Sequence, residues 1–202
     1  MPEARRGRAR SESARRAILE ATRDELAHHG YDKLSIDRIA AAAGAGKQTV
    51  YRWYPSKSAL VAECILDGYV ALGTIPIPDT GDIRRDLRDW LRAFADHAGQ
   101  PPAASLLRAA TAAAADNDEV AARFYERVTA AAEATLTARL RAAEHAGQLR
   151  TGAPATAAAQ ALIGGVLYRL LVHQPLTHGF ADDLADVMLG GLERAPEAAP
   201  PP

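Results

Sequence analysis

The feature that most constrains the fold is a pair of short helical patterns separated by a glycine-containing turn, in residues 35–54. Ser35 is a favourable N-cap for the first pattern, "SIDRIAAAAG", which ends at Gly44. After two intervening residues the second pattern begins near Lys47, and Pro55 stops it because proline cannot continue a helix. Two short helices joined in this way predict a helix-turn-helix motif, whose second helix lies in the major groove of DNA.

The second of these helices carries residue types that suit contact with DNA. Glutamine can bind adenine through two hydrogen bonds, the threonine methyl can contact the thymine methyl, and lysine can bind guanine or phosphate. A tyrosine hydroxyl can reach a phosphate. In this sequence these residues are Gln48, Thr49, Lys47 and Tyr51. The alternative is that the aromatic side chains only fill a core, and we adopt it for Tyr54, which pairs at i,i+4 with Val50.

Charge is distributed unevenly along the chain. Residues 1–60 hold twelve Lys and Arg against seven Asp and Glu, a net charge of +5, whereas residues 61–202 hold twelve against eighteen, a net charge of −6. This asymmetry predicts a basic head for a polyanion and an acidic body with another role. Residues 1–12 contain Arg5, Arg6, Arg8 and Arg10 without apolar periodicity, so we expect a flexible basic arm. Contact of this arm with DNA and simple solvation both stay open.

The rest of the sequence indicates an all-α protein. Alanine occupies 46 positions, with leucine and arginine also frequent, and all three favour helices. We expect about nine helices, at 13–29, 35–44, 47–54, 57–73, 82–98, 102–115, 118–146, 154–173 and 180–193, the seventh with a capping box from Asp116 to Glu119. The predicted domains are the arm 1–12, a three-helix DNA-binding domain 13–58, a helical body 59–194 and a disordered tail 195–202.

Other classes of protein find little support in the sequence. No run of about eighteen apolar residues is present, and the basic N-terminus lacks the apolar segment of a secretory signal. The single cysteine, Cys64, lies in the apolar helical pattern "LVAECIL" and is expected to pack as a small hydrophobe. No nucleophile motif, phosphate loop or metal-ligand spacing occurs, so we expect no enzyme activity, cofactor or metal. The single thiol suits a reducing compartment, and we expect a cytoplasmic protein.

Residues 13–72 resemble the N-terminal region of the tetracycline-repressor (TetR) family of transcriptional regulators. The resemblance rests on "AILEAT" and on "HGYDKLSIDRIAAAAGAGKQTVYRWYPSKSALV". It implies that Lys47, Gln48 and Thr49 contact the bases or the backbone of DNA. It also implies that Tyr51 and Lys57 bind phosphate and that Ser35 lies near one. Trp53 is then expected in the DNA groove, and Arg52 is a further candidate contact. Gly46 departs from the serine that commonly caps the second helix in this family, which removes one hydroxyl.

The same resemblance implies a C-terminal body that dimerises and binds an effector. Independently, the pattern at 154–173 is apolar on nearly all sides, and it contains Gly164 and Gly165, which permit close helix approach. We expect a two-fold interface of the last two helices, formed by Leu162, Ile163, Val166, Leu170, Leu184, Val187 and Met188. A core within the single chain is the alternative for these residues.

An effector pocket is the least constrained part of the sequence. Aromatic and polar residues at helical spacing suggest a pocket for an apolar or aromatic molecule, lined by Trp90, Phe94, His97, Phe124, Tyr125, Val128 and Tyr168. Each of them also fits an ordinary core. With the family resemblance, we expect a regulator that binds a palindromic operator as a homodimer and is released by a small molecule. A repressor is the expectation, and the residues themselves leave an activator open. An architectural DNA-binding protein without effector, and a small helical ligand-binding protein or enzyme, are the alternatives.

Overall fold

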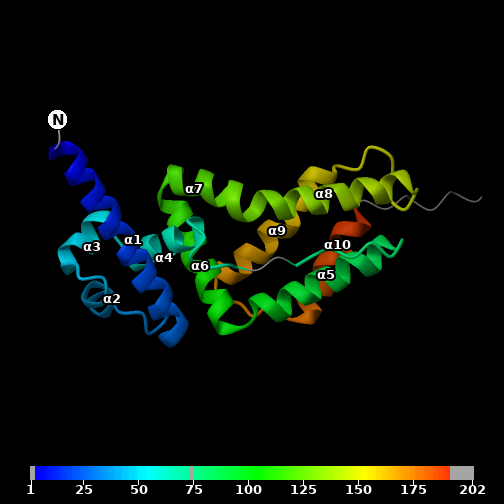
Figure 1. The fold of residues 1–202 in the computed structure, drawn as a ribbon. Coiled ribbons are helices and arrows are strands. Elements are labelled where there is room, and N and C mark those ends of the chain that lie inside the picture. Colours follow the sequence, from blue (N-terminus) through cyan, green and yellow to red (C-terminus); the bar gives the residue numbers. More distant parts are fainter. Residues whose placement is uncertain (1–2, 73–74, 192–202) are drawn as a thin grey trace, which may run out of the picture. The chain divides into compact units, whose positions relative to one another are not determined.

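The computed structural model describes residues 3–72 and 75–191, and every element assigned in them is a helix (Figure 1). The elements are α1 (Glu3–His29), α2 (Ile36–Ala42), α3 (Lys47–Trp53), α4 (Lys57–Leu66), α5 (Ile83–Ala98), α6 (Pro101–Asp116), α7 (Asp118–Phe124), the π-helix η1 (Tyr125–Thr129), α8 (Ala130–His145), α9 (Ala155–Leu171) and α10 (His178–Gly190). Since α7, η1 and α8 follow one another without a gap, the described residues form nine continuous helical segments. The all-α prediction is confirmed.

The chain divides into two compact units. Of the described residues, the first unit comprises 3–72 and 101–128, and the second comprises 75–100 and 129–191. In the first unit α4 packs against α1, α6 and α7, while α2 packs against α1 and α3. In the second unit α5 packs against α10 and α8, and α9 packs against α8 and α10. The helix-turn-helix therefore shares its compact unit with α4, α6 and α7.

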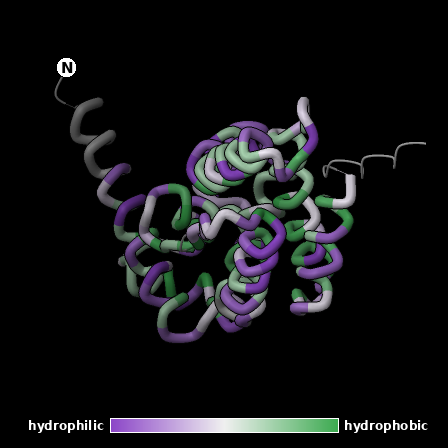
Figure 2. Tube along the Cα trace, turned by 90° about the vertical axis from the view of Figure 1, so that its right-hand side faces the viewer, coloured by the Kyte–Doolittle hydropathy of each residue, from purple (hydrophilic) through white to green (hydrophobic). Residues whose placement is uncertain are grey.

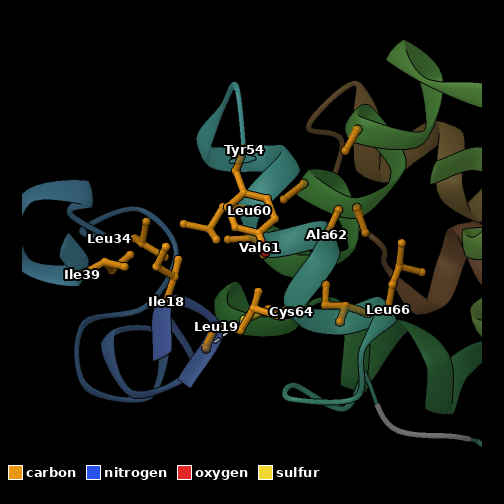
Figure 3. Packing of buried hydrophobic residues seen from close by; sticks show 14 of the residues in the cluster. Ile18, Leu19, Leu34, Ile39, Tyr54, Leu60, Val61, Ala62, Cys64 and Leu66 are labelled. Atoms are coloured by element: carbon orange, nitrogen blue, oxygen red, sulfur yellow. Dashed lines mark hydrogen bonds between the residues drawn. The ribbon is translucent and has the colours of Figure 1, made fainter. Parts of the chain in front are cut away.

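Apolar residues from all four N-terminal helices meet in the core of the first unit. Figure 3 shows this cluster, and its fully buried members include Ile18, Ile39, Val50 and Leu60. Each such side chain contributes about 1.5–3 kcal/mol through removal from water. This core fixes α2 and α3 on α1 and α4, and so it positions the helix-turn-helix.

Cys64 belongs to the same core. Its thiol is buried and donates a hydrogen bond to the carbonyl oxygen of Leu19 at 3.2 Å, and the two residues adjoin in Figure 3. Burial raises the pKa of the Cys64 thiol to about 12. The thiol therefore stays protonated near neutral pH, and the prediction that Cys64 packs as a small hydrophobe is confirmed.

Two helix boundaries differ from those that the sequence indicated. The first helix begins at Glu3, within the segment expected to be a flexible arm, because Glu, Ala and Arg sustain a helix even without an apolar face. The fourth helix ends at Leu66 rather than near residue 73, because Gly68 adopts a left-handed φ of 77° and the amide of Tyr69 bonds to the carbonyl of Cys64 at 2.9 Å. The predicted tail at 195–202 lies outside the described residues.

The cap of α7 also differs from the expected capping box. Asn117 is the N-cap, and its side-chain oxygen accepts a hydrogen bond from the amide of Val120 at 3.0 Å. Asp116 instead ends α6. An asparagine directly before a helix is as good a cap as the aspartate one residue earlier, so the sequence pattern was ambiguous here.

A buried ion pair organises the second unit. Asp86 accepts hydrogen bonds from Arg139 Nε at 3.0 Å and from the Thr80 hydroxyl at 2.6 Å, and both charged side chains are buried. Burial raises the pKa of Asp86, but the hydrogen bonds from Thr80 and Arg139 outweigh that effect and hold it below its usual value. The pair therefore joins α5, α8 and the segment that precedes α5.

Hydrophilic and hydrophobic residues are interleaved along the helical turns (Figure 2). Among the described residues, no helix combines the length and apolarity that crossing a membrane requires.

Candidate nucleic-acid interface

The turn between α2 and α3 is built by backbone hydrogen bonds. The amide of Ala45 bonds to the carbonyl of Ala40 at 2.9 Å, and the amide of Gly44 bonds to the carbonyl of Ala41 at 3.2 Å. This is the Schellman pattern, in which the residue after the C-cap adopts a left-handed conformation. Gly44 has a φ of 62°, as the pattern requires. The glycine turn predicted from the sequence thus sets the angle between the two helices.

The ends of both helices are capped by the residues that the sequence indicated. The Ser35 hydroxyl oxygen accepts a hydrogen bond from the amide of Arg38 at 3.4 Å and caps α2. Gly46 is the N-cap of α3 and contributes no side-chain hydrogen bond. The first turn of α3 therefore lacks a side-chain cap, and the amide of Thr49 bonds instead to the carbonyl of Gly46 at 2.8 Å.

One face of α3 is buried and the opposite face is exposed. Val50 and Tyr54 are buried in the core of the first unit, as predicted, and the Tyr54 ring lies against Leu60 in Figure 3. Burial raises the pKa of the Tyr54 hydroxyl, which has no hydrogen-bond partner among the described residues. Gln48 and Arg52 are exposed, and Tyr51 is 44% exposed. This exposed face carries residue types that bind bases and phosphates.

Both candidate lysines are held by neighbours within the head. Lys47 Nζ lies 2.9 Å from a carboxylate oxygen of Asp37, and this ion pair raises the pKa of Lys47. Lys57 Nζ lies 4.3 Å from the centre of the Tyr31 ring and donates to the carbonyl oxygen of Asp32 at 3.3 Å. Lys57 is thereby placed beside the loop that leads into α2, at the edge of the motif.

A second charged contact joins α1 to the start of α2. Glu25 of α1 is buried and accepts hydrogen bonds from Arg38 Nε at 2.7 Å and from the amide of Ser35 at 3.3 Å. The bond from Arg38 is the main cause that lowers the pKa of Glu25, against the opposing effect of burial. Glu25 therefore stays ionised at neutral pH and fixes the start of α2.

Trp53 and Thr49 are half-buried and so differ from the fully exposed residues of α3. Trp53 packs against the core of the first unit and also lines a groove of about 710 Å³. The groove is further lined by residues of α4, α6 and α7, among them Ala59, Glu63, Ala113, Val120 and Arg123. Part of the Trp53 indole therefore packs against the protein, and only its accessible part can contact a DNA groove.

A network of ion pairs at α4 was not predicted from the sequence. Glu63 on α4 and Asp67, the C-cap residue of α4, both pair with Arg15 of α1 and with Arg123 of α7. Arg123 Nη1 lies 2.9 Å from Glu63 Oε2, and Arg123 Nη2 lies 2.7 Å from Asp67 Oδ1. The available signal was a pair of acids at i,i+4 spacing near an otherwise apolar helix, without any indication of which arginines would meet them.

The expected dimer-interface residues fall into two groups. Leu162, Val166 and Leu170 are buried within the chain, so the expectation that they face a partner is corrected. A helix that is apolar on nearly all sides buries one side in its own chain, and here α9 packs against α8 and α10. The other four expected residues, Ile163, Leu184, Val187 and Met188, are partly or fully exposed.

The two glycines of α9 have different surroundings. A Cβ atom at Gly165 would lie 3.5 Å from Leu184, so this glycine allows α10 to approach, whereas a Cβ at Gly164 would meet nothing within 4 Å. On the same two helices and at the end of α9, four large apolar side chains are exposed: Tyr168 is 65% exposed and Val187 is 74% exposed, and Leu171 and Val172 are also exposed. Close helix approach is thus observed at Gly165 within the chain.

The expected effector residues are divided between the two units. Trp90 and Phe94 lie in the second unit with ring centres 6.0 Å apart, and Trp90 donates to the carbonyl of Ile75 at 3.1 Å. In the same unit His97 and Tyr168 are exposed. Phe124, Tyr125 and Val128 belong to the first unit, where Phe124 and Val128 pack in its core and Tyr125 is exposed. The helical spacing that suggested a pocket also fits these ordinary core and surface positions.

The described residues contain no group of three or more His, Cys, Asp or Glu side chains that could hold a metal ion.

Two family models match the chain. "Bacterial regulatory proteins, tetR family" matches residues 18–64, which include the helix-turn-helix. "Tetracyclin repressor-like, C-terminal domain" matches residues 77–188, which is more than half of the 202 residues.

Similar proteins carry related descriptions. An uncharacterized HTH-type transcriptional regulator of Mycobacterium bovis is 30% identical over 180 residues, which is 88% of this chain and 87% of the relative. The DNA-binding transcriptional repressor TetR of Mycobacteroides abscessus is 38% identical over 79 residues, 39% of this chain and 41% of that protein. The crystal structure of a TetR family transcription regulator matches with 31% identity and a TM-score of 0.59, covering 88% of this chain and 97% of the other.

Proposed function

This chain belongs to the TetR family of bacterial transcriptional regulators, and from that premise we propose that it represses transcription as a homodimer on a palindromic operator, from which a small-molecule effector releases it. It is a DNA-binding regulator and not an enzyme. The observation that carries the proposal is the exposed face of α3, where Gln48, Tyr51 and Arg52 stand opposite the buried Val50 and Tyr54.

The proposed contacts follow from the position of each side chain on the motif. Gln48 and Thr49, in the first turn of α3, contact base edges, and Lys47 contacts phosphate or a base. Tyr51, Arg52, Lys57 and Ser35 bind phosphates on either side of the groove. Trp53 adds contact with its accessible part. Residues 13–58 act as the DNA-binding domain and residues 59–194 as the effector-binding and dimerisation domain, in a cytoplasmic protein that associates with the nucleoid.

The proposed dimer interface lies on the apolar surface of α9 and α10. Ile163, Leu184, Val187 and Met188 contribute to it, and the exposed Tyr168, Leu171 and Val172 extend it. Gly164 supports this choice because, among the described residues, no atom beyond its chain neighbours and the nearby backbone of α9 lies within 4 Å of its Cβ position, which leaves room for a partner helix. A self-complementary patch of this kind suits a two-fold axis and hence a palindromic site.

Release by an effector requires different effector affinities in the DNA-competent and incompetent states. The effector site is proposed in the C-terminal domain, with Trp90 and Phe94 as its aromatic candidates. Their adjacent rings suit an apolar or aromatic molecule. Repression itself is proposed from the similarity to the transcriptional repressor of Mycobacteroides abscessus.

Selection of genomic DNA fragments with the purified protein tests the proposal. A palindromic site bound at least ~10³-fold more tightly than random DNA is the expected result for a specific dimeric regulator. Arg52→Ala and Gln48→Ala should both weaken binding to that site, but only Gln48→Ala should relax selectivity among bases. Weak binding without sequence preference that is lost steeply with salt would instead support an architectural protein.

A further inference from the structure

The lysine that begins α3 is occupied by a carboxylate of the same motif. Lys47 Nζ lies 2.9 Å from one oxygen of Asp37 and 3.1 Å from the other. Asp37 is in the first turn of α2 and Lys47 is in the first turn of α3, so the pair bridges the two helices across the glycine turn. The side chains are 70% and 52% exposed, respectively, so DNA can approach the pair directly.

The other cations of the head have different partners. Arg38 binds the buried Glu25, which anchors α2 on α1 and leaves that charge committed to the fold. Lys57 is held by a backbone carbonyl and an aromatic ring, neither of which carries a charge that repels phosphate. Arg52 makes no ion pair within residues 3–72 and 75–191. Lys47 is therefore the one candidate DNA contact of α3 whose ammonium lies against an exposed anion within the part of the chain that the structure describes.

We propose that Asp37 lowers the affinity of α3 for the DNA backbone, because its carboxylate competes with phosphate for the ammonium group of Lys47. The inference rests on the proposed function of the head. A phosphate that approaches Lys47 must displace the Asp37 carboxylate, and the displaced carboxylate then lies near the phosphate as a like charge. Binding to random DNA depends almost entirely on such phosphate contacts, so this competition acts there most directly.

The first test compares the wild type with Asp37→Asn on a random-sequence DNA duplex over a series of salt concentrations. The variant is expected to bind about two- to fivefold more tightly at low salt, with a slope of log K against log salt steeper by up to about one, as for one additional phosphate contact. An unchanged affinity and slope would overturn the inference. Thermal unfolding of the variant establishes that α2 is intact, since asparagine is compatible with the first turn of a helix.

A double-mutant cycle separates competition for Lys47 from a general effect of charge. In a Lys47→Gln background, Asp37→Asn should no longer change the affinity, because the group for which Asp37 competes is absent. An equal gain in both backgrounds would show that Asp37 acts only through its field, and would overturn the inference.

Asp32→Asn serves as the matched control. Asp32 is an exposed acid in the loop before α2, and its side chain makes no ion pair in the part of the chain that the structure describes. Its removal changes the net charge of the head equally, so it should raise the affinity less than Asp37→Asn, and an equal effect would contradict the inference. If the wild type binds no DNA at all, the proposed function fails as well, whereas binding that is insensitive to Asp37→Asn removes this inference alone.

Discussion

At Gly44 the backbone enters the left-handed region, with a φ of 62°, and apart from its two chain neighbours no atom of the described residues lies within 4 Å of the Cβ position. Gly44→Ala therefore adds no steric contact with neighbours, and its effect is almost purely conformational. We expect the free energy of unfolding to fall by about 1–2 kcal/mol, the cost of placing an L-residue in this conformation. Urea denaturation followed by circular dichroism measures it.

Gly46, two residues later, provides the control for this prediction. Its backbone is extended, with a φ of −73°, so a side chain causes no strain there. Gly46→Ser should leave stability unchanged or raise it by a few tenths of a kcal/mol through a new N-cap. Equal losses in the two variants would mean that the turn tolerates no side chain for reasons other than backbone conformation.

Cys64 supplies a prediction about pH. The folded state raises the pKa of its thiol from 9.0 to about 12, so the folded protein holds this proton more tightly than the unfolded chain does. The contribution of this pKa difference to the free energy of unfolding is fully present below pH 9 and is lost as the pH rises from about 9 toward 12. Cys64→Ala should make the decline of unfolding free energy between pH 8.5 and pH 10.5 shallower, measured by urea denaturation across roughly that window. An identical decline in both proteins would exclude Cys64 as a contributor.

Single residues differ in how far the sequence reveals their role. The cap at Ser35 and the turn at Gly44 act on their immediate neighbours, so local patterns predicted them. The ion pair of Asp37 with Lys47 joins residues ten positions apart, and its formation depends on the angle that the turn gives to α3. A sequence reports the charges but not that angle, and this contact was therefore not predicted.

Among the elements, α4 is tied to its neighbours by charge as well as by apolar packing. Arg123→Gln removes the contacts of α7 with Glu63 and Asp67 and leaves those of Arg15 in place. These side chains are partly exposed, so solvent screening limits the effect to about 1 kcal/mol of unfolding free energy. The loss should shrink as salt is raised, because screening weakens the ion pairs.

Arg141→Gln is the control for this network. Arg141 is exposed and makes no ion pair in the described part of the chain, so its replacement should change stability by less than about 0.5 kcal/mol. If both variants behaved alike, the network would contribute nothing beyond what any surface arginine does. Chemical denaturation at low and high salt distinguishes the two cases.

Element boundaries show where sequence patterns lose information. The start of α1 was placed too late because helical propensity continues where apolar periodicity stops. The end of α4 was placed too late because an apolar stretch continues beyond Gly68, although a glycine there fits a C-terminal cap. The long helix at 118–146 was correctly predicted as continuous, but its π-helical turn at Tyr125–Thr129 left no sequence signal that we recognised.

At the scale of the whole molecule, apolar patterns do not say whether a side chain meets its own chain or a partner. Leu162 was expected at an interface, yet it is fully buried by its own chain. Leu162→Ala should therefore lower the unfolding free energy by about 2–5 kcal/mol, as large-to-small core substitutions do. A loss that varied strongly with protein concentration would instead place Leu162 at a subunit contact, so urea denaturation at two concentrations decides between them.

Val187 also tests the proposed interface, because unlike Leu162 it is exposed, with 74% of its surface accessible on α10. A glutamate there would place a charge in the apolar contact of a dimer but would stay solvated in a monomer. Val187→Glu is expected to shift the protein from dimer to monomer, as sedimentation velocity measures, and to weaken operator binding because the two heads no longer bind as one unit. Binding of random DNA by a single head should change much less. A variant that stays dimeric would move the interface away from this face of α10 and leave the DNA-binding proposal intact.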